Sequence, residues 1–112
     1  MAKYAFFFTY TSEAWGRMIQ NPGDRTAAIR QLAEKMGGSL ESVYWMTGTH
    51  DGLVIGDFPD SVSAAALSVA VGSSGAFKNL ETHELFSQEQ LGRILSRSKE
   101  ATGAYQAPGQ QS

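Results

Sequence analysis

The sequence lacks cysteine altogether. That absence excludes disulfides, thiolate zinc sites and a cysteine nucleophile. Long apolar runs are also missing, because none approaches the roughly 18–20 residues that span a bilayer. The N-terminal stretch "MAKYAFFFTY" has no small-residue cleavage site of the kind that ends a signal peptide. We therefore expect a cytoplasmic protein that makes no contact with a membrane.

Clustered charge of one sign is absent as well. Nine Lys and Arg residues stand against 11 Asp and Glu residues, which gives a net charge of −2. Proteins that bind nucleic acid usually carry a clustered basic face, because neutralising phosphates supplies much of their affinity. We therefore expect no nucleic-acid partner. A chain of 112 residues is long enough to bury a core in one domain.

Hydrophobic periodicity and turn residues predict eight structural segments. The predicted strands are residues 3–10, 39–47, 52–58 and 77–86, and the predicted helices are residues 11–20, 25–36, 61–72 and 87–101. Asp24, Asp60 and the pair Ser87 and Gln90 are the expected helix caps. Residues 102–112 are rich in Gly, Gln, Pro and Ser, so we expect a single domain over residues 1–101 and a flexible tail over residues 102–112.

The order of these segments predicts an α+β fold. It is the ferredoxin-like βαββαβ sandwich with an extra C-terminal helix. Four antiparallel strands are expected in the spatial order 4-1-3-2, with both main helices on one face of the sheet.

Both faces of the predicted sheet carry apolar side chains. Because side chains alternate along a strand, Phe6 and Phe8 share one face of the first strand while Phe7 lies on the other. On residues 39–47 we expect Leu40 and Tyr44 to share a face. Helices cover only one face, and a monomer rarely exposes so large an apolar patch.

The uncovered face therefore predicts self-association. A second copy would give a homodimer of the dimeric α/β-barrel type, or a larger homo-oligomer, in which a standard interface buries roughly 800 Å² per partner. A rival interpretation is that the exposed aromatics stack RNA bases. Residues 52–58, "GLVIGDF", lack the basic and aromatic residues of that class.

Several short motifs connect the sequence to a known family. They are "GGSLESVYW", the G-x-x-D turn from Gly48 to Asp51, "FPD" followed by an Ala-rich helix, and "SSGAF". On these motifs residues 3–91 resemble the GYD-domain family, small bacterial and archaeal proteins that are largely of unknown function. The resemblance implies the ferredoxin-like fold and no particular reaction. One difference is His50, which stands where the family commonly has a tyrosine.

His50 and Asp51 are the candidate catalytic residues. A histidine can act as a general base, and a carboxylate can orient it. The alternative is that Asp51 only hydrogen-bonds amides of the hairpin turn. By strand rise we expect His50 and His83 to lie roughly 20 Å apart in one subunit. That separation is too large for a shared metal ion, so no metal site is predicted.

Aromatic residues and the second histidine supply a candidate ligand pocket. Its predicted lining consists of Tyr10, Trp15, Tyr44, Trp45 and His83. The alternative is ordinary core packing. The first functional hypothesis is a homo-oligomeric domain that binds a small apolar or aromatic molecule or acts as an accessory protein. The others are a cofactor-free enzyme, monooxygenase-like or isomerase-like, with a histidine base, and a structural assembly subunit. No cofactor is predicted.

Overall fold

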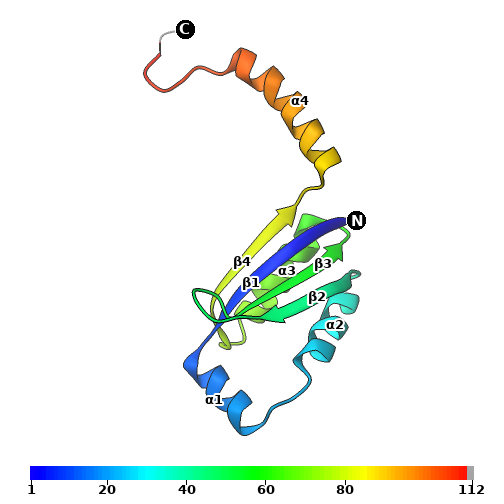
Figure 1. Cartoon of the computed structure of the whole chain (residues 1–112), viewed down its shortest axis with the longest axis vertical. Coiled ribbons are helices and arrows are strands. Elements are labelled where there is room, and N and C mark those ends of the chain that lie inside the picture. The colour runs from blue at the N-terminus through cyan, green and yellow to red at the C-terminus, as the bar shows by residue number, and fades with distance from the viewer. Residues whose placement is uncertain (111–112) are drawn as a thin grey trace.

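The computed structural model describes residues 1–110 and contains all eight predicted elements (Figure 1). The strands are β1 (Ala2–Tyr10), β2 (Ser39–Trp45), β3 (Gly52–Phe58) and β4 (Phe77–Leu85). The helices are α1 (Ser12–Gln20), α2 (Arg25–Lys35), α3 (Ser61–Gly72) and α4 (Gln88–Ala104). Helix α4 thus continues into the predicted tail, and the last two residues of that tail, 111–112, lie outside the described part of the chain.

The sheet has four strands in the order β2-β3-β1-β4, and every neighbouring pair is antiparallel. This is the predicted order 4-1-3-2 read in reverse, so the α+β topology is confirmed. Helix α2 packs beside β2, and α3 packs against β3 and β4. The structure is that of a single chain, so the dimeric barrel remains a prediction.

Capping side chains fix where the helices begin. Asp60 accepts a hydrogen bond from the Ser63 amide at 2.7 Å, and this bond holds the pKa of the Asp60 carboxyl below its usual value. Ser87 and Gln90 form a reciprocal capping box at the start of α4. An N-cap supplies an acceptor to amides that lack a partner in the first helical turn. The caps predicted from the sequence are therefore present.

The core lies between the sheet and the helices. It is built on one face of β1, whose aromatic side chains at alternate positions are Tyr4, Phe6, Phe8 and Tyr10. Phe58 on β3 is only 1% exposed, and its ring packs edge-on against the Phe6 ring at a centroid distance of 5.6 Å. Such packing explains why β1 contains so many aromatics in a row.

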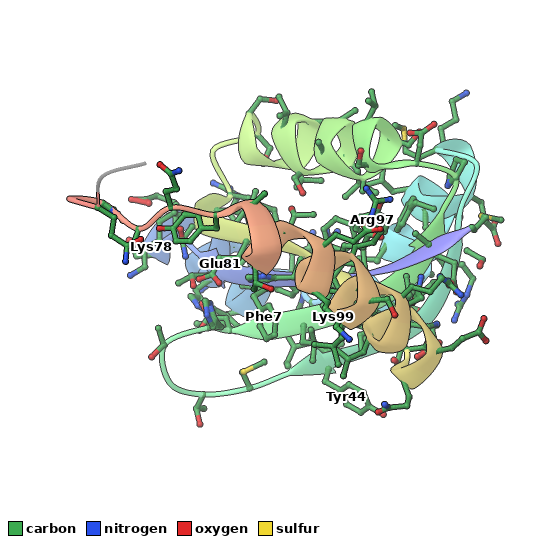
Figure 2. The ribbon with its side chains drawn as sticks, turned by 90° about the horizontal axis from the view of Figure 1, so that it is seen from above. Phe7, Tyr44, Lys78, Glu81, Arg97 and Lys99 are labelled. Atoms are coloured by element: carbon green, nitrogen blue, oxygen red, sulfur yellow. The ribbon has the colours of Figure 1, made fainter. Side chains whose placement is uncertain are left out.

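The opposite surface of the sheet, which we call the open face, has an apolar centre with charged margins. Strand register places Phe7 beside both Leu53 and Glu81. The apolar members are Phe7, Tyr44, Leu53 and Ile55, and the charged or ionisable ones are Lys3, Glu41, Asp57, Glu81 and His83. Figure 2 shows Phe7 and Tyr44 on the side of the sheet away from α3.

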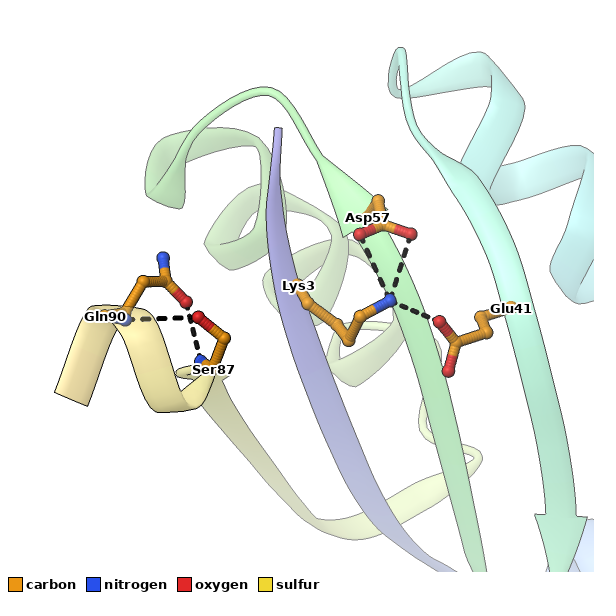
Figure 3. A network of polar contacts seen from close by, with 5 residues as sticks. All are labelled: Lys3, Glu41, Asp57, Ser87 and Gln90. Carbon is orange, nitrogen blue, oxygen red and sulfur yellow. Dashed lines mark hydrogen bonds and ion pairs between the residues drawn. The ribbon is translucent and has the colours of Figure 1, made fainter. Parts of the chain in front are cut away.

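Lys3 ties three strands together at one margin of the open face. Its ammonium group lies between the carboxylates of Glu41 on β2 and Asp57 on β3, with 3.3 Å to Asp57 Oδ1 (Figure 3). The hydrogen bond to Glu41 is the main cause that raises the pKa of Lys3. Cross-strand ion pairs of this kind support the register of the sheet.

A β-bulge corrects one prediction about β2. The register shifts between Leu40 and Ser42, so Leu40 pairs with Gly56 whereas Tyr44 pairs with Leu53 on the open face. Leu40 lines the space beneath the helices. The expectation that Leu40 and Tyr44 share a face was wrong, because a bulge inserts one residue and reverses the alternation.

Helix α4 extends away from the rest of the molecule. Figure 1 shows it continuing beyond the end of β4, and the chain has extents of 62 × 31 × 23 Å. Within residues 1–110 none of the helices combines the length and apolarity needed to cross a membrane.

Candidate functional site

A cavity of about 100 Å³ lies between the sheet and the two helices that cover it. Phe6 and Phe8 form its floor on β1, Ile29 and Leu32 face it from α2, and Leu67 faces it from α3. Its remaining lining includes Ala28, Ala33, Val54, Val71, Phe77 and Leu80, with Arg25 and Ser68 as the polar members. Such a lining suits an apolar organic group rather than an ion.

Tyr10 stands at one end of this cavity and is held from both sides. Its ring stacks on Phe77 at a centroid distance of 5.1 Å and meets the edge of Trp15 at 5.0 Å. Tyr10 is 5% exposed, whereas Trp15 is 39% exposed. Trp15 therefore lies on the outer side of Tyr10.

Asp51 fastens the β2–β3 connection to β1 and α1. Its carboxylate oxygen Oδ2 accepts hydrogen bonds from the Tyr10 amide at 2.9 Å and from Trp15 Nε1 at 3.2 Å. Its backbone N–H donates to the Phe8 carbonyl at 2.7 Å. Asp51 thus orients the aromatic end of the cavity and makes no hydrogen bond to His50. Both acceptor contacts reach beyond the turn in which Asp51 sits.

His50 and His83 meet at a shared carboxylate on the open face. His50 Nε2 lies 3.3 Å from Glu81 Oε2, and His83 Nε2 lies 3.1 Å from Glu81 Oε1. The Phe7 ring packs against both imidazoles, at centroid distances of 5.2 and 5.7 Å. We call these four residues the histidine cluster.

The expected separation of roughly 20 Å between His50 and His83 was therefore wrong. That expectation placed His50 at the end of the sheet where residues 77–86 begin and counted about six residues along that strand to His83. Instead, the connection continues across the end of β1, as Figure 1 shows. The Thr9 hydroxyl donates to the Thr49 carbonyl at 3.2 Å, and the Asp51 amide bonds to β1. His50 is thereby carried over β1 to reach β4.

The histidine cluster has a defined proton arrangement. A carboxylate only accepts hydrogen bonds, so His83 Nε2 must carry the proton that it shares with Glu81. The hydrogen bond from His83, aided by the nearby imidazole of His50, lowers the pKa of the Glu81 carboxyl. The Nδ1 atom of His50 is buried without a hydrogen-bond partner among the described residues. The His83 side chain is 52% exposed.

Metal binding finds no geometric support in the described residues. Within residues 1–110 no group of three or more His, Asp or Glu side chains is arranged to hold a metal ion. In the histidine cluster the two Nε2 atoms face different oxygens of Glu81.

Comparison with known proteins identifies the domain. The profile of the GYD domain family matches residues 4–95, which include β1 from Tyr4 onward, the other three strands and the first half of α4. This chain belongs to the GYD-domain family. No curated protein matches the sequence.

Among solved structures, this GYD domain is similar to 30S ribosomal protein S6 from Thermotoga maritima. The TM-score is 0.56 at 10% sequence identity, over 90% of this chain and 97% of that chain. At such low identity the similarity shows the fold alone. It supports the ferredoxin-like arrangement of the GYD domain.

The five predicted ligand residues of the GYD domain do not form one pocket. Tyr10 lines the cavity, and Trp15 lies outside it. Tyr44 and His83 are on the open face. Trp45 lines a separate surface depression beside Met18 and the loop before α2. The predicted site is divided because neighbouring strand residues point to opposite faces.

Sequence reasoning missed Glu81. Glu81 precedes His83 by two positions on β4, and this spacing places both on one face of a strand. That signal was available in the sequence. Arg25, near the start of a helix, was a possible anion-binding residue from the sequence, but its place beside the cavity depends on where α2 sits on the sheet.

Proposed function

We propose that this GYD domain binds a small apolar or aromatic molecule in the cavity between the sheet and helices α2 and α3. The supporting observation is the cavity itself, which is lined almost entirely by aliphatic and aromatic side chains. Protein interiors are otherwise packed as densely as organic crystals.

The cavity also indicates the size class of its occupant. An engineered apolar cavity of about 150 Å³ binds benzene. The cavity here, at about 100 Å³, would accept a single aromatic ring or a short alkyl group. Arg25 at its mouth is exposed and makes no ion pair among the described residues. Its guanidinium would suit a ligand that carries a polar or anionic group beside the ring.

Thermal denaturation in the presence of benzene, toluene, indole and benzoate tests this proposal. We expect at least one probe to raise the melting temperature in a saturable manner, since a ligand that binds only the folded state stabilises it. Ala28→Leu narrows the cavity and should abolish the shift. Ala66→Leu, on the exposed side of α3, should preserve it. The proposal fails if no probe raises the melting temperature, or if Ala28→Leu responds as the wild type does.

The histidine cluster favours a second candidate, a cofactor-free enzyme. Glu81 holds the His83 ring in one orientation, which leaves the Nδ1 atom of an exposed imidazole available as a general base. The Phe7 ring, which packs against the His83 imidazole, would contact a substrate there. Deuterium incorporation from D2O into a panel of small ketones, followed by proton NMR, tests this candidate. His83→Ala should abolish exchange and Glu84→Ala, on the other face of β4, should not. No exchange above the solvent background rejects the candidate.

A further inference from the structure

Helix α4 carries an apolar stripe that its own chain leaves exposed. Leu91, Ile94 and Leu95 are 41%, 38% and 58% exposed. They recur at the i, i+3, i+4 spacing of one helical face, which Ser98, Ala101 and Thr102 continue. Figure 1 shows α4 clear of the sheet and of the other helices. A helix of this length is marginal in water without packing partners, so the stripe requires a surface to cover it.

Basic side chains border this stripe. At about 100° per residue, Arg97 falls along one edge of the stripe and Lys99 along the other. Glu89 and Glu100 lie on the far side of the helix. Arg97 Nε does lie 2.9 Å from Glu100 Oε2, but both side chains are largely exposed. An exposed ion pair contributes little free energy, so Arg97 can leave Glu100 for an acidic partner at little cost.

The open face of the sheet has the complementary pattern. Its centre is apolar, with Phe7, Leu53 and Ile55 half-buried and Tyr44 exposed. Glu81 on β4 and Glu41 on β2 place acidic groups at its two margins. The distribution of charge along the chain fits this complementarity. Residues 1–87 hold six Lys or Arg and nine Asp or Glu, so they are net acidic, whereas residues 88–112 hold three Lys or Arg and two Asp or Glu, so they are net basic.

The connection between β4 and α4 is short, since only Phe86 and Ser87 separate the strand from the helix. Ser87 caps α4 through its reciprocal hydrogen bonds with Gln90, seen in Figure 3. Helix α4 continues beyond the end of β4, away from the sheet (Figure 1). To lie on the open face of its own chain, α4 would have to reverse its direction within these two residues. A second copy of the chain can supply that face to α4 in its present direction.

We propose that α4 of one copy docks its apolar stripe on the open face of a second copy, and that the exchange is reciprocal. The dimensions agree, since 17 helical residues span about 25 Å and the nine residues of β1 about 30 Å. Two such contacts together would need to bury about 1,200–2,000 Å², the usual range for a stable interface. The proposed dimer uses the face of the sheet away from the cavity. A failure of the dimer test therefore leaves the proposed ligand binding untouched, and the reverse also holds.

Sedimentation equilibrium of the full chain tests the dimer. We expect the wild type to be dimeric and Leu95→Glu to weaken the dimer roughly tenfold or more, because it places a charge in the buried stripe. Ser96→Glu, one residue along but on the opposite side of α4, should leave the dimer intact. A monomeric wild type overturns the proposal. So does a dimer that Leu95→Glu leaves unchanged while its far-UV circular dichroism stays native.

Cysteine crosslinking identifies which surfaces meet, and the cysteine-free sequence gives a clean background. Chains carrying Tyr44→Cys are mixed with chains carrying Leu95→Cys and then oxidised. We expect a disulfide that joins one chain of each kind, identified by mass spectrometry. If the two sheets instead dimerise face to face, the disulfides will join only chains that carry Tyr44→Cys to one another. That result overturns the proposal. A monomeric disulfide in the Tyr44→Cys, Leu95→Cys double variant also overturns it, since α4 would then lie on its own sheet.

Discussion

The carboxylate of Asp51 accepts a hydrogen bond from the Trp15 indole at 3.2 Å, joining the β2–β3 connection to helix α1 across 36 positions of sequence. The same oxygen accepts the Tyr10 amide at the point where β1 ends. Helix α1 otherwise attaches to the body through Ala14 and Met18. Asp51 therefore positions the aromatic end of the cavity, which is a structural duty for a residue that the sequence nominates as catalytic.

Replacing Asp51 with alanine should destabilise the domain. Both donors would lose a charged acceptor, and we expect a decrease of about 1–3 kcal/mol in the free energy of unfolding. Urea denaturation followed by far-UV circular dichroism measures the change. Trp15→Phe keeps the contact with the Tyr10 ring and removes only the indole N–H, so it should cost less than Asp51→Ala. An Asp51→Ala variant as stable as the wild type would show that the hydrogen bonds to Asp51 do not stabilise the domain.

Glu81 should make the domain less stable in acid. Its folded pKa lies below the ordinary value of 4.5, chiefly because His83 hydrogen-bonds to the carboxylate. The unfolded carboxyl therefore binds a proton more readily than the folded one. The stabilisation is present above the unfolded pKa and is lost as the pH falls through the folded pKa.

Glu81→Gln removes this carboxyl and tests the assignment. We expect the difference in unfolding free energy between wild type and Glu81→Gln to shrink as the pH is lowered from about 6 to about 3. Chemical denaturation at a series of pH values gives the difference directly. Glu84→Gln is the matched control, because Glu84 lies on the other face of β4, paired with Tyr4. A difference that stays constant with pH contradicts the role given to Glu81.

The sheet topology was predictable because its signals are local. Aromatic alternation along β1, the glycines of the hairpin and the caps at Asp24, Asp60 and Ser87 each specify one element. The bulge after Leu40 gave no such signal, and it reversed the face assigned to that residue.

The candidate site was less predictable, since it depends on contacts between distant segments. His50 meets His83 only because the hairpin connection crosses β1, and that path is fixed by Thr9 and the Asp51 amide. The cavity depends on how far α2 and α3 stand from the sheet. Spacing along one element carries no information about such distances.

Gly52 is required by the close approach of an aromatic ring. A Cβ atom at this position would lie 2.0 Å from Cζ of Phe8, which is buried and cannot move away easily. We expect Gly52→Ala to destabilise the domain by about 1–3 kcal/mol, measured by urea denaturation. Gly16→Ala in α1 is the control. No atom lies within 4 Å of its Cβ position, so it should stabilise the helix by about 0.5–1 kcal/mol. Equal effects at the two positions would contradict this explanation.

Filling the cavity should stabilise the domain even without a ligand. Ala28 lines the cavity from α2, and a leucine there would place three further carbon atoms among Ile29, Leu32 and Leu67. Because cavity-filling substitutions commonly add about 0.5–2 kcal/mol, we expect Ala28→Leu to raise the free energy of unfolding within that range. Ala66→Leu makes the same chemical change at an exposed position and should alter the free energy by less than about 0.5 kcal/mol. Chemical denaturation measures the free energy of unfolding of both variants. Because the substitution is identical, the change in helix propensity is shared, and the difference between the two variants reports the burial of the leucine side chain. If Ala28→Leu is instead destabilised, the leucine is overpacked and the space beneath α2 is smaller than a ligand requires.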